Sequence, residues 1–185
     1  HRMSSAASDV YKRQNLRGNT SGTINATNLA TLTGSASTMK TALEAASVTN
    51  MGGVNATLNS NHNLAQLKAI NNATTGTITL HAYDVALTDG TISDASQALA
   101  AGTLAATYTG SVTVTDTGTV AVANVNALDL LTDGAIDIST VGTLSGEAAA
   151  IKTALESSGI TGDGGVNVSI TNNHNLAQLK AINNA

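Results

Sequence analysis

Histidine side chains are the first candidates for chemistry, because imidazole is the commonest metal ligand and general base in proteins. His62 and His174 stand at the same position of an internal repeat, each followed by Asn-Leu-Ala-Gln-Leu. A catalytic or metal-binding histidine needs a particular set of partners, whereas these two recur with the repeat, so we expect a structural role. His81 has Tyr83 and Asp84 close behind it but no second ligand at a metal-site spacing.

Aspartates in turn-like segments form the second set of candidates. The weak calcium candidates are Asp89, Asp116, Asp133 and Asp163. Calcium takes about six to eight oxygen ligands, and each loop here supplies only one or two carboxylates. Three of the four aspartates stand directly before glycine, a dipeptide typical of turns. The pattern predicts turns first, and a calcium site only where adjacent segments contribute ligands together.

Threonines alternate with other residues between Thr113 and Thr119. Their hydroxyls could line one strand face, as on the flat surfaces of some ice-binding proteins. The run is not repeated at equal strength elsewhere, and a solvated strand rich in β-forming residues explains it more simply. No Ser-His-Asp order, paired-carboxylate signature or phosphate-binding loop occurs in the sequence. We therefore expect no enzymatic activity and no cofactor.

The composition limits the fold that could position such residues. Ala, Thr, Asn, Gly and Ser supply 111 of 185 residues, and the chain has no Pro, Cys, Phe or Trp. This excludes a disulfide framework, cysteine-ligated metal sites and an aromatic-centred core. The net charge of −4 argues against nucleic acid as a partner. No apolar run approaches the length of a membrane span, so we expect no membrane insertion.

Internal repetition is the strongest organising signal. Residues 28–73 and 140–185 align without a gap at an offset of 112, and 27 of the 46 positions are identical. The segment HNLAQLKAINNA occurs unchanged at 62–73 and at 174–185. A more divergent copy between them halves the period to about 56 residues. The strand Val112–Val114 lies midway between corresponding strands, and Gly76 and Gly134 begin equivalent strand patterns.

Hydrophobic spacing predicts alternating helices and strands. Apolar residues at helical spacing predict helices over 37–46, 64–71, 93–101, 120–131 and 148–157. Alternation of apolar and polar residues predicts strands over 77–80, 111–117, 135–138 and 167–171. Further short strands are expected near 85–87 and 141–144. Asn63 with Gln66, and Asn175 with Gln178, have the spacing of helix capping boxes.

These patterns predict an α/β fold, a repetitive parallel βα solenoid of about three 56-residue units. The expected units are 15–73, a divergent 74–129, and 130–185, the last one cut short. Such coils pack on their neighbours and need no large aromatic core. Tandem, small, β-rich sandwich-like domains are the alternative architecture.

The N-terminal segment differs from everything after it. Residues 4–14, SSAASDVYKRQ, resemble the in-frame translation of a sequencing adapter and have no counterpart in the repeats. We expect residues 1–14 to be a disordered, non-native tail that takes no part in the fold. We expect a native chain that is longer at both ends, because the adapter-like segment precedes the repeats and the last repeat stops at Ala185, where Ala73 of the first copy continues into TTGTITL.

The repeats themselves resemble a known class of protein. The phrases LAQLKAINNATTGTITL and SGEAAAIKTALESSG are similar to repeats of very large secreted or cell-surface proteins of marine bacteria, including cyanobacteria. The resemblance implies an extracellular, adhesin-like stalk whose partners are neighbouring repeats of the same chain. The resemblance also implies cell-surface or glycan ligands as partners. A calcium-, glycan- or ice-binding repeat module is the alternative function.

Overall fold

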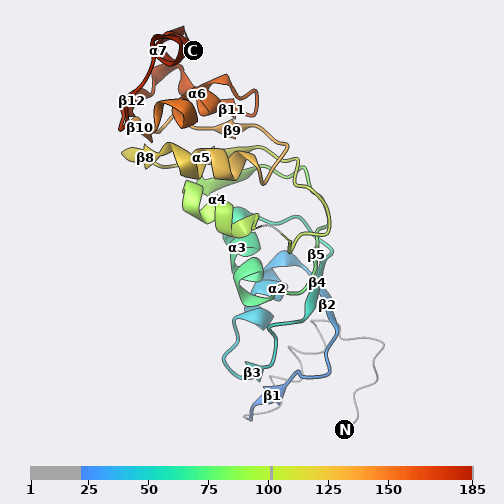
Figure 1. The fold of residues 1–185 in the computed structure, drawn as a ribbon. Helices are drawn as coiled ribbons and strands as arrows, with labels where there is room; N and C mark the ends of the chain where they lie inside the picture. The colour runs from blue at the N-terminus through green and yellow to red at the C-terminus, as the bar shows by residue number, and fades with distance from the viewer. Residues whose placement is uncertain (1–21, 101, 185) are drawn as a thin grey trace. The chain divides into compact units, whose positions relative to one another are not determined.

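The computed structural model describes residues 22–100 and 102–184 (Figure 1). The tail expected at 1–14 lies outside these residues. Strands and helices alternate along the described chain, and every strand pair is parallel. The predicted α/β class is therefore confirmed. Sandwich-like domains are built from antiparallel sheets, so the alternative architecture does not match these strand pairs.

Two compact units make up the described chain. The first holds the described residues up to Val85 together with Gln97–Thr107. Its strands are β1 (Ile24–Asn25), β2 (Thr31–Gly34), β3 (Val48–Thr49), β4 (Asn55–Leu58) and β5 (Ile78–Thr79). β1 pairs with β3, and a second sheet has the order β2-β4-β5. Helices α2 (Ala36–Leu43) and α3 (Leu64–Ala73) pack against each other.

The second unit holds Ala86–Ser96 and the described residues from Tyr108 onward. One of its sheets has the order β11-β9-β7-β6 and the other the order β12-β10-β8. The strands of the first are β6 (Leu87–Gly90), β7 (Val112–Val114), β9 (Ile136–Asp137) and β11 (Ile160–Thr161). The strands of the second are β8 (Thr119–Ala121), β10 (Thr143–Gly146) and β12 (Asn167–Ile170).

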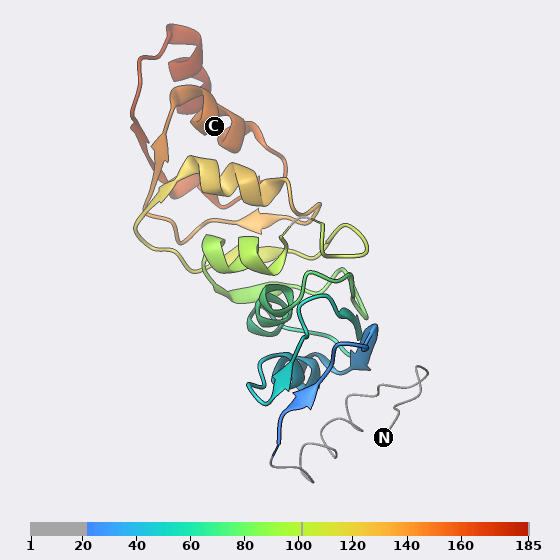
Figure 2. The ribbon, with the colours of Figure 1, turned by 60° about the horizontal axis from the view of Figure 1, so that its bottom comes forward.

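Helices of the second unit lie side by side in both ribbon views (Figure 2). They are α5 (Val122–Asp129), α6 (Ala148–Glu156) and α7 (Leu176–Asn184), and α6 contacts both of the others. A short 3-10 helix, η1, spans Asp163–Gly165. Helix α4 (Ile92–Ala98) groups with this unit as far as Ser96, and its last two residues group with the first unit.

The register of the sheets sets the offset between several pairs of neighbouring strands, and we call each pass of the backbone through such a strand and the helix that follows it a coil. Val112 lies opposite Ile136, and Ile136 lies opposite Ile160. Thr143 in turn lies between Thr119 and Asn167. Each of these pairs is 24 residues apart, so equivalent residues of successive coils stand in rows. A row of buried aliphatic side chains runs through Val112, Ile136 and Ile160.

Helices recur at a related spacing. Successive helices begin 26 to 30 residues apart, at Ala36, Leu64, Ile92, Val122, Ala148 and Leu176. The 56-residue period of the sequence therefore spans two helices and two passes of the backbone.

All five predicted helices are present, and their bounds differ from the predicted ones by at most three residues. The predicted strands are present as β5, β7, β9 and β12, and the two further strands as β6 and β10. One equivalence differs from the sequence alignment. β7 and β12, which the 56-residue offset aligns, lie in different sheets, and the strand that leads into α5 is β8.

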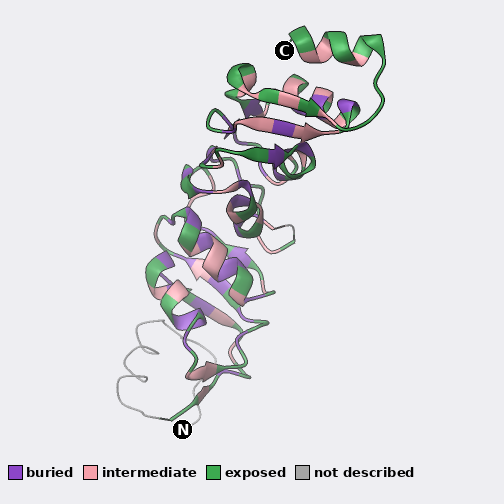
Figure 3. Ribbon diagram, turned by 90° about the vertical axis from the view of Figure 1, so that its left-hand side faces the viewer, coloured by how far each residue is buried: buried purple, intermediate pink, exposed green. Residues whose placement is uncertain are grey.

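The core is aliphatic, as the composition requires. The largest fully buried side chains are those of Leu, Ile and Met residues, together with Tyr108, the one aromatic side chain among them. Buried residues recur along most strands and helices of both units, whereas β1, β3, β12 and α7 contain none (Figure 3).

Candidate functional site

The most regular polar contacts of the chain join a helix N-terminus to the following coil. The N–H of Ala36 in α2 donates to Ser60 Oγ at 3.1 Å. The N–H of Ile92 in α4 donates to Asp116 Oδ2 at 2.8 Å. In α6, Ala148 N–H donates to Asn172 Oδ1 at 2.9 Å. We call Ser60, Asp116 and Asn172 the inter-coil caps.

Each inter-coil cap stands 24 residues after the N–H that it accepts, and the three recur at intervals of 56. The first N–H groups of an α-helix have no partner within the helix, so an accepting side chain stabilises its start. Here that side chain comes from the next coil. The 56-residue sequence period thus has a direct counterpart in hydrogen bonding. These hydrogen bonds were not predicted from the sequence.

Helices α3 and α7 are capped locally, whereas α5 has no side-chain cap. Asn63 Oδ1 accepts the N–H of Gln66 at 2.9 Å, and Gln66 Oε1 accepts the N–H of Asn63 at 3.1 Å. Asn175 and Gln178 form the same reciprocal pair at the start of α7. Both predicted capping boxes are confirmed.

A threonine hydroxyl closes the corner that follows some of the helices. Thr74 Oγ1 donates to Val54 O at 2.6 Å and accepts the N–H of Gly76 at 3.0 Å. Thr132 Oγ1 donates to Tyr108 O at 3.0 Å and accepts the N–H of Gly134 at 2.9 Å. Both threonines are buried, so each hydroxyl satisfies backbone groups that water does not reach.

The two corner glycines are required by space. A Cβ added at Gly76 would stand 2.5 Å from Val54 O. One added at Gly134 would collide with the backbone of Gly110. Any side chain would push the two coils apart, which explains why the sequence pattern places glycine at both points.

The aspartate candidates do not converge. Asp116 is engaged as an inter-coil cap, and Asp89 and Asp133 are exposed. Asp163 is half-buried in η1, where its main-chain carbonyl accepts the N–H of Val166. Within residues 22–100 and 102–184, no group of three or more His, Cys, Asp or Glu side chains is arranged to hold a metal ion.

The histidines stand in contrasting surroundings. His62 is 5% exposed, and burial lowers its pKa below the ordinary value of 6.5. His174, in an identical stretch of sequence, is exposed. His81 is exposed too, and the neighbouring Tyr83 hydroxyl accepts the N–H of Leu80 at 3.2 Å. The fold does not bring any two of these three imidazole rings together.

The threonine run does not form one flat face. The strand β7 ends at Val114, and Thr119 begins β8 in the other sheet. The predicted strand over 111–117 is therefore too long. The hydroxyls of the run are divided between two sheets and the loop that joins them, so they do not form a continuous ladder.

Among the helices of the described residues, none combines the length and the hydropathy that a membrane span requires. Comparison with known proteins adds no relative, since no family model, curated protein or solved structure matches the chain.

Proposed function

We propose that the chain is a structural repeat segment of a large, adhesin-like extracellular surface protein, and that it extends or presents other domains. The observation that supports this proposal most directly is the set of inter-coil caps, which join Ala36 to Ser60, Ile92 to Asp116 and Ala148 to Asn172. Polar side chains that a binding protein would aim at a ligand are aimed here at the next coil.

In this proposal the chain is a βα solenoid of about three 56-residue units, 15–73, 74–129 and 130–185, each made of two coils. The parallel pairing of strands supports the solenoid, because β7, β9 and β11 pair one after another in chain order. The spacing of 56 between inter-coil caps supports the length of the unit.

Stability in such a fold is the sum of contributions from each coil and from each interface between neighbouring coils. Neighbouring repeats are then the principal partners, and no enzymatic reaction or cofactor is needed. The acidic, cysteine-free, threonine- and asparagine-rich composition suits an exposed stalk outside the cell.

The test is a chain lengthened by two further units. Residues 74–185 are appended after Ala185, which reproduces the natural junction between Ala73 and Thr74. Equilibrium denaturation is then compared with that of the original chain. We expect a higher free energy of unfolding and a higher melting temperature, because further interfaces between coils have formed.

The matched control carries Ile78→Asp and Leu80→Asp in the appended copy only, at positions that are buried in the first copy. It has the same length but cannot stack its coils, so the melting temperature of the original part should stay where it was. Equal stability of the original and the correctly lengthened chain would contradict the proposal.

A further inference from the structure

We infer that the open side of β12 and α7 is a docking edge for one more βα coil of the kind that residues 74–107 form. The inference rests on the repeat architecture of the proposed function and names the partner of one particular surface. We call this surface the terminal edge, and it comprises Val166–Ile170 and Leu176–Asn183.

The evidence is one sequence seen in two surroundings. Residues 62–73 and 174–185 are identical. In the first copy Leu64 is 3% exposed and Leu67 is fully buried. In the second copy Leu176 is 82% exposed and Leu179 is 42% exposed. Since the residues are the same, the difference comes from what covers them.

In the first unit, residues that follow α3 are hydrogen-bonded to its C-terminal end. Asn71 Nδ2 donates to Gln97 O at 2.8 Å and to Ala98 O at 3.2 Å. These carbonyls lie at the C-terminal end of α4, where backbone carbonyls have no N–H donor within their own helix. Asn183 stands at the corresponding position of α7 and is exposed. The side-chain amide of Asn183 is therefore placed to donate hydrogen bonds to the last carbonyls of another helix.

The backbone shows the same contrast. β4 is the central strand of its sheet, and the N–H of Ala56 donates to Thr77 O at 2.9 Å. Val168 occupies the corresponding position of β12, which is an edge strand of the described sheet. An edge strand presents backbone groups that a further parallel strand can pair with.

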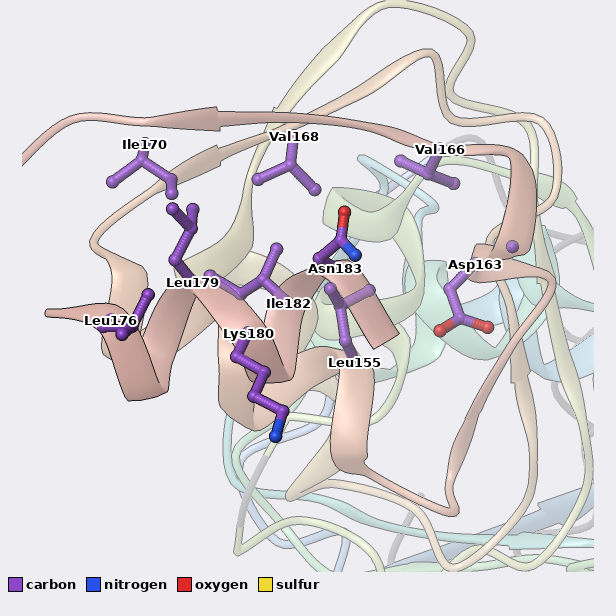
Figure 4. A pocket seen from close by; sticks show the side chains of 11 residues that line it. Leu155, Asp163, Val166, Val168, Ile170, Leu176, Leu179, Lys180, Ile182 and Asn183 are labelled. Atoms are coloured by element: carbon purple, nitrogen blue, oxygen red, sulfur yellow. The ribbon is translucent and has the colours of Figure 1, made fainter. Parts of the chain in front are cut away.

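The terminal edge is also apolar. β12 and α7 line a hollow in which Val168 and Ile170 face Leu179 and Ile182 (Figure 4). The corresponding residues of the first unit are all buried, namely Val54, Ala56, Leu58, Leu64, Leu67 and Ile70. Apolar side chains gathered on one surface commonly mark an interaction site.

These observations specify the occupant. It must offer a parallel strand like the one around Thr77, an aliphatic inner face, and a helix whose last carbonyls meet an asparagine amide. Residues 74–107 meet all three requirements beside α3. Within the chain that segment is already engaged, so a second copy of the whole chain does not offer it in a free form.

A cysteine reporter tests the docking directly, because the chain has no cysteine of its own. Leu176→Cys is made in the original chain and in a chain with residues 74–107 appended after Ala185. We expect the rate of thiol labelling to fall at least tenfold in the lengthened chain. Ala177→Cys is the matched control, since the corresponding Ala65 stays exposed beside a covering coil, and its labelling rate should not change.

Hydrogen exchange of the unsubstituted lengthened chain gives a second measurement. The amide of Val168 should become protected, and an appended coil that carries Ile78→Asp should leave it unprotected. Equal labelling of the Leu176→Cys thiol with and without the appended coil, together with an unprotected Val168 amide, would overturn the inference.

Concentration-dependent protection in the original chain would overturn it too, because a second copy would then be the occupant. Neither result would remove the proposed structural role, because the contacts between coils already present, the inter-coil caps among them, support that role independently of this surface.

Discussion

The carboxylate of Asp116 accepts a hydrogen bond from the backbone N–H of Ile92, the first residue of α4, at 2.8 Å. Ser60 and Asn172 accept the corresponding N–H groups at the other two points of the 56-residue period. Ser, Asp and Asn differ in charge and size, but all three are good acceptors for a helix N-terminus. The position therefore tolerates a change of side chain as long as an acceptor remains.

Asp116→Ala should destabilise the protein by about 1 kcal/mol, the usual effect of removing a helix cap. Asp116→Ser and Asp116→Asn should keep most of that stability, because the chain itself uses Ser60 and Asn172 in this role. Urea denaturation measures the differences. Asp84→Ala, at an exposed position, is the control. Equal stability of the alanine and asparagine variants at 116 would contradict the capping role.

Gly134→Ala should destabilise the protein by about 3 kcal/mol, at the upper end for an added methyl group in a packed region. The new Cβ would collide with the backbone of Gly110, and a backbone atom cannot turn aside as a flexible side chain can. Gly118→Ala is the matched control, because nothing lies within 4 Å of a Cβ at that position. Thermal melting of both variants is the measurement, and similar melting temperatures would show that the two coils are not in close contact.

Burial of His62 makes stability depend on pH in the acid range. The pKa of His62 is lowered in the folded chain, so below about pH 6.5 the unfolded chain binds a proton that the folded chain resists. The free energy of unfolding should therefore fall as the pH decreases from 6.5 through the folded pKa, and this group adds no dependence above 6.5.

The variant His62→Gln should flatten this slope, whereas His174→Gln, at the exposed copy, should leave it unchanged. Denaturation midpoints from pH 5 to pH 8 compare the three proteins. A slope that flattens equally in both variants would show that His62 is not distinguished by burial.

Calcium should leave the melting temperature unchanged at millimolar concentration. A ligand present at 100 times its dissociation constant stabilises the folded state by about 2.7 kcal/mol, which a melting experiment detects easily. The aspartates at 89, 116, 133 and 163 lie apart, and one of them serves as an inter-coil cap. Magnesium at the same concentration controls for ionic strength. A rise with calcium alone would favour a binding module over a structural repeat.

Local features of the fold could be predicted from the sequence because they depend on residues close together in the chain. The helix over Leu64–Ala73 follows from apolar spacing, and its capping box follows from Asn63 and Gln66. Glycine at 76 and 134 indicated equivalent corners, although the reason, a close approach of backbone, needed the structure.

Contacts between coils could not be predicted in the same way. Residue types recur every 56 or 112 positions, whereas the backbone pairs at 24, as in Val112 with Ile136. The sequence period therefore does not reveal the register. The role of Asp116 was missed for this reason, because its partner Ile92 lies 24 residues earlier in another coil.

The stacking of coils depends most directly on the parallel register of β7, β9 and β11. Nuclear Overhauser contacts between backbone protons measure it without any substitution. We expect contacts that join Val112 to Ile136 and Ile136 to Ile160, residues 24 apart in parallel strands. Contacts that instead join each strand to its sequence neighbour in antiparallel hairpins would contradict the stacking of coils and the structural role built on it.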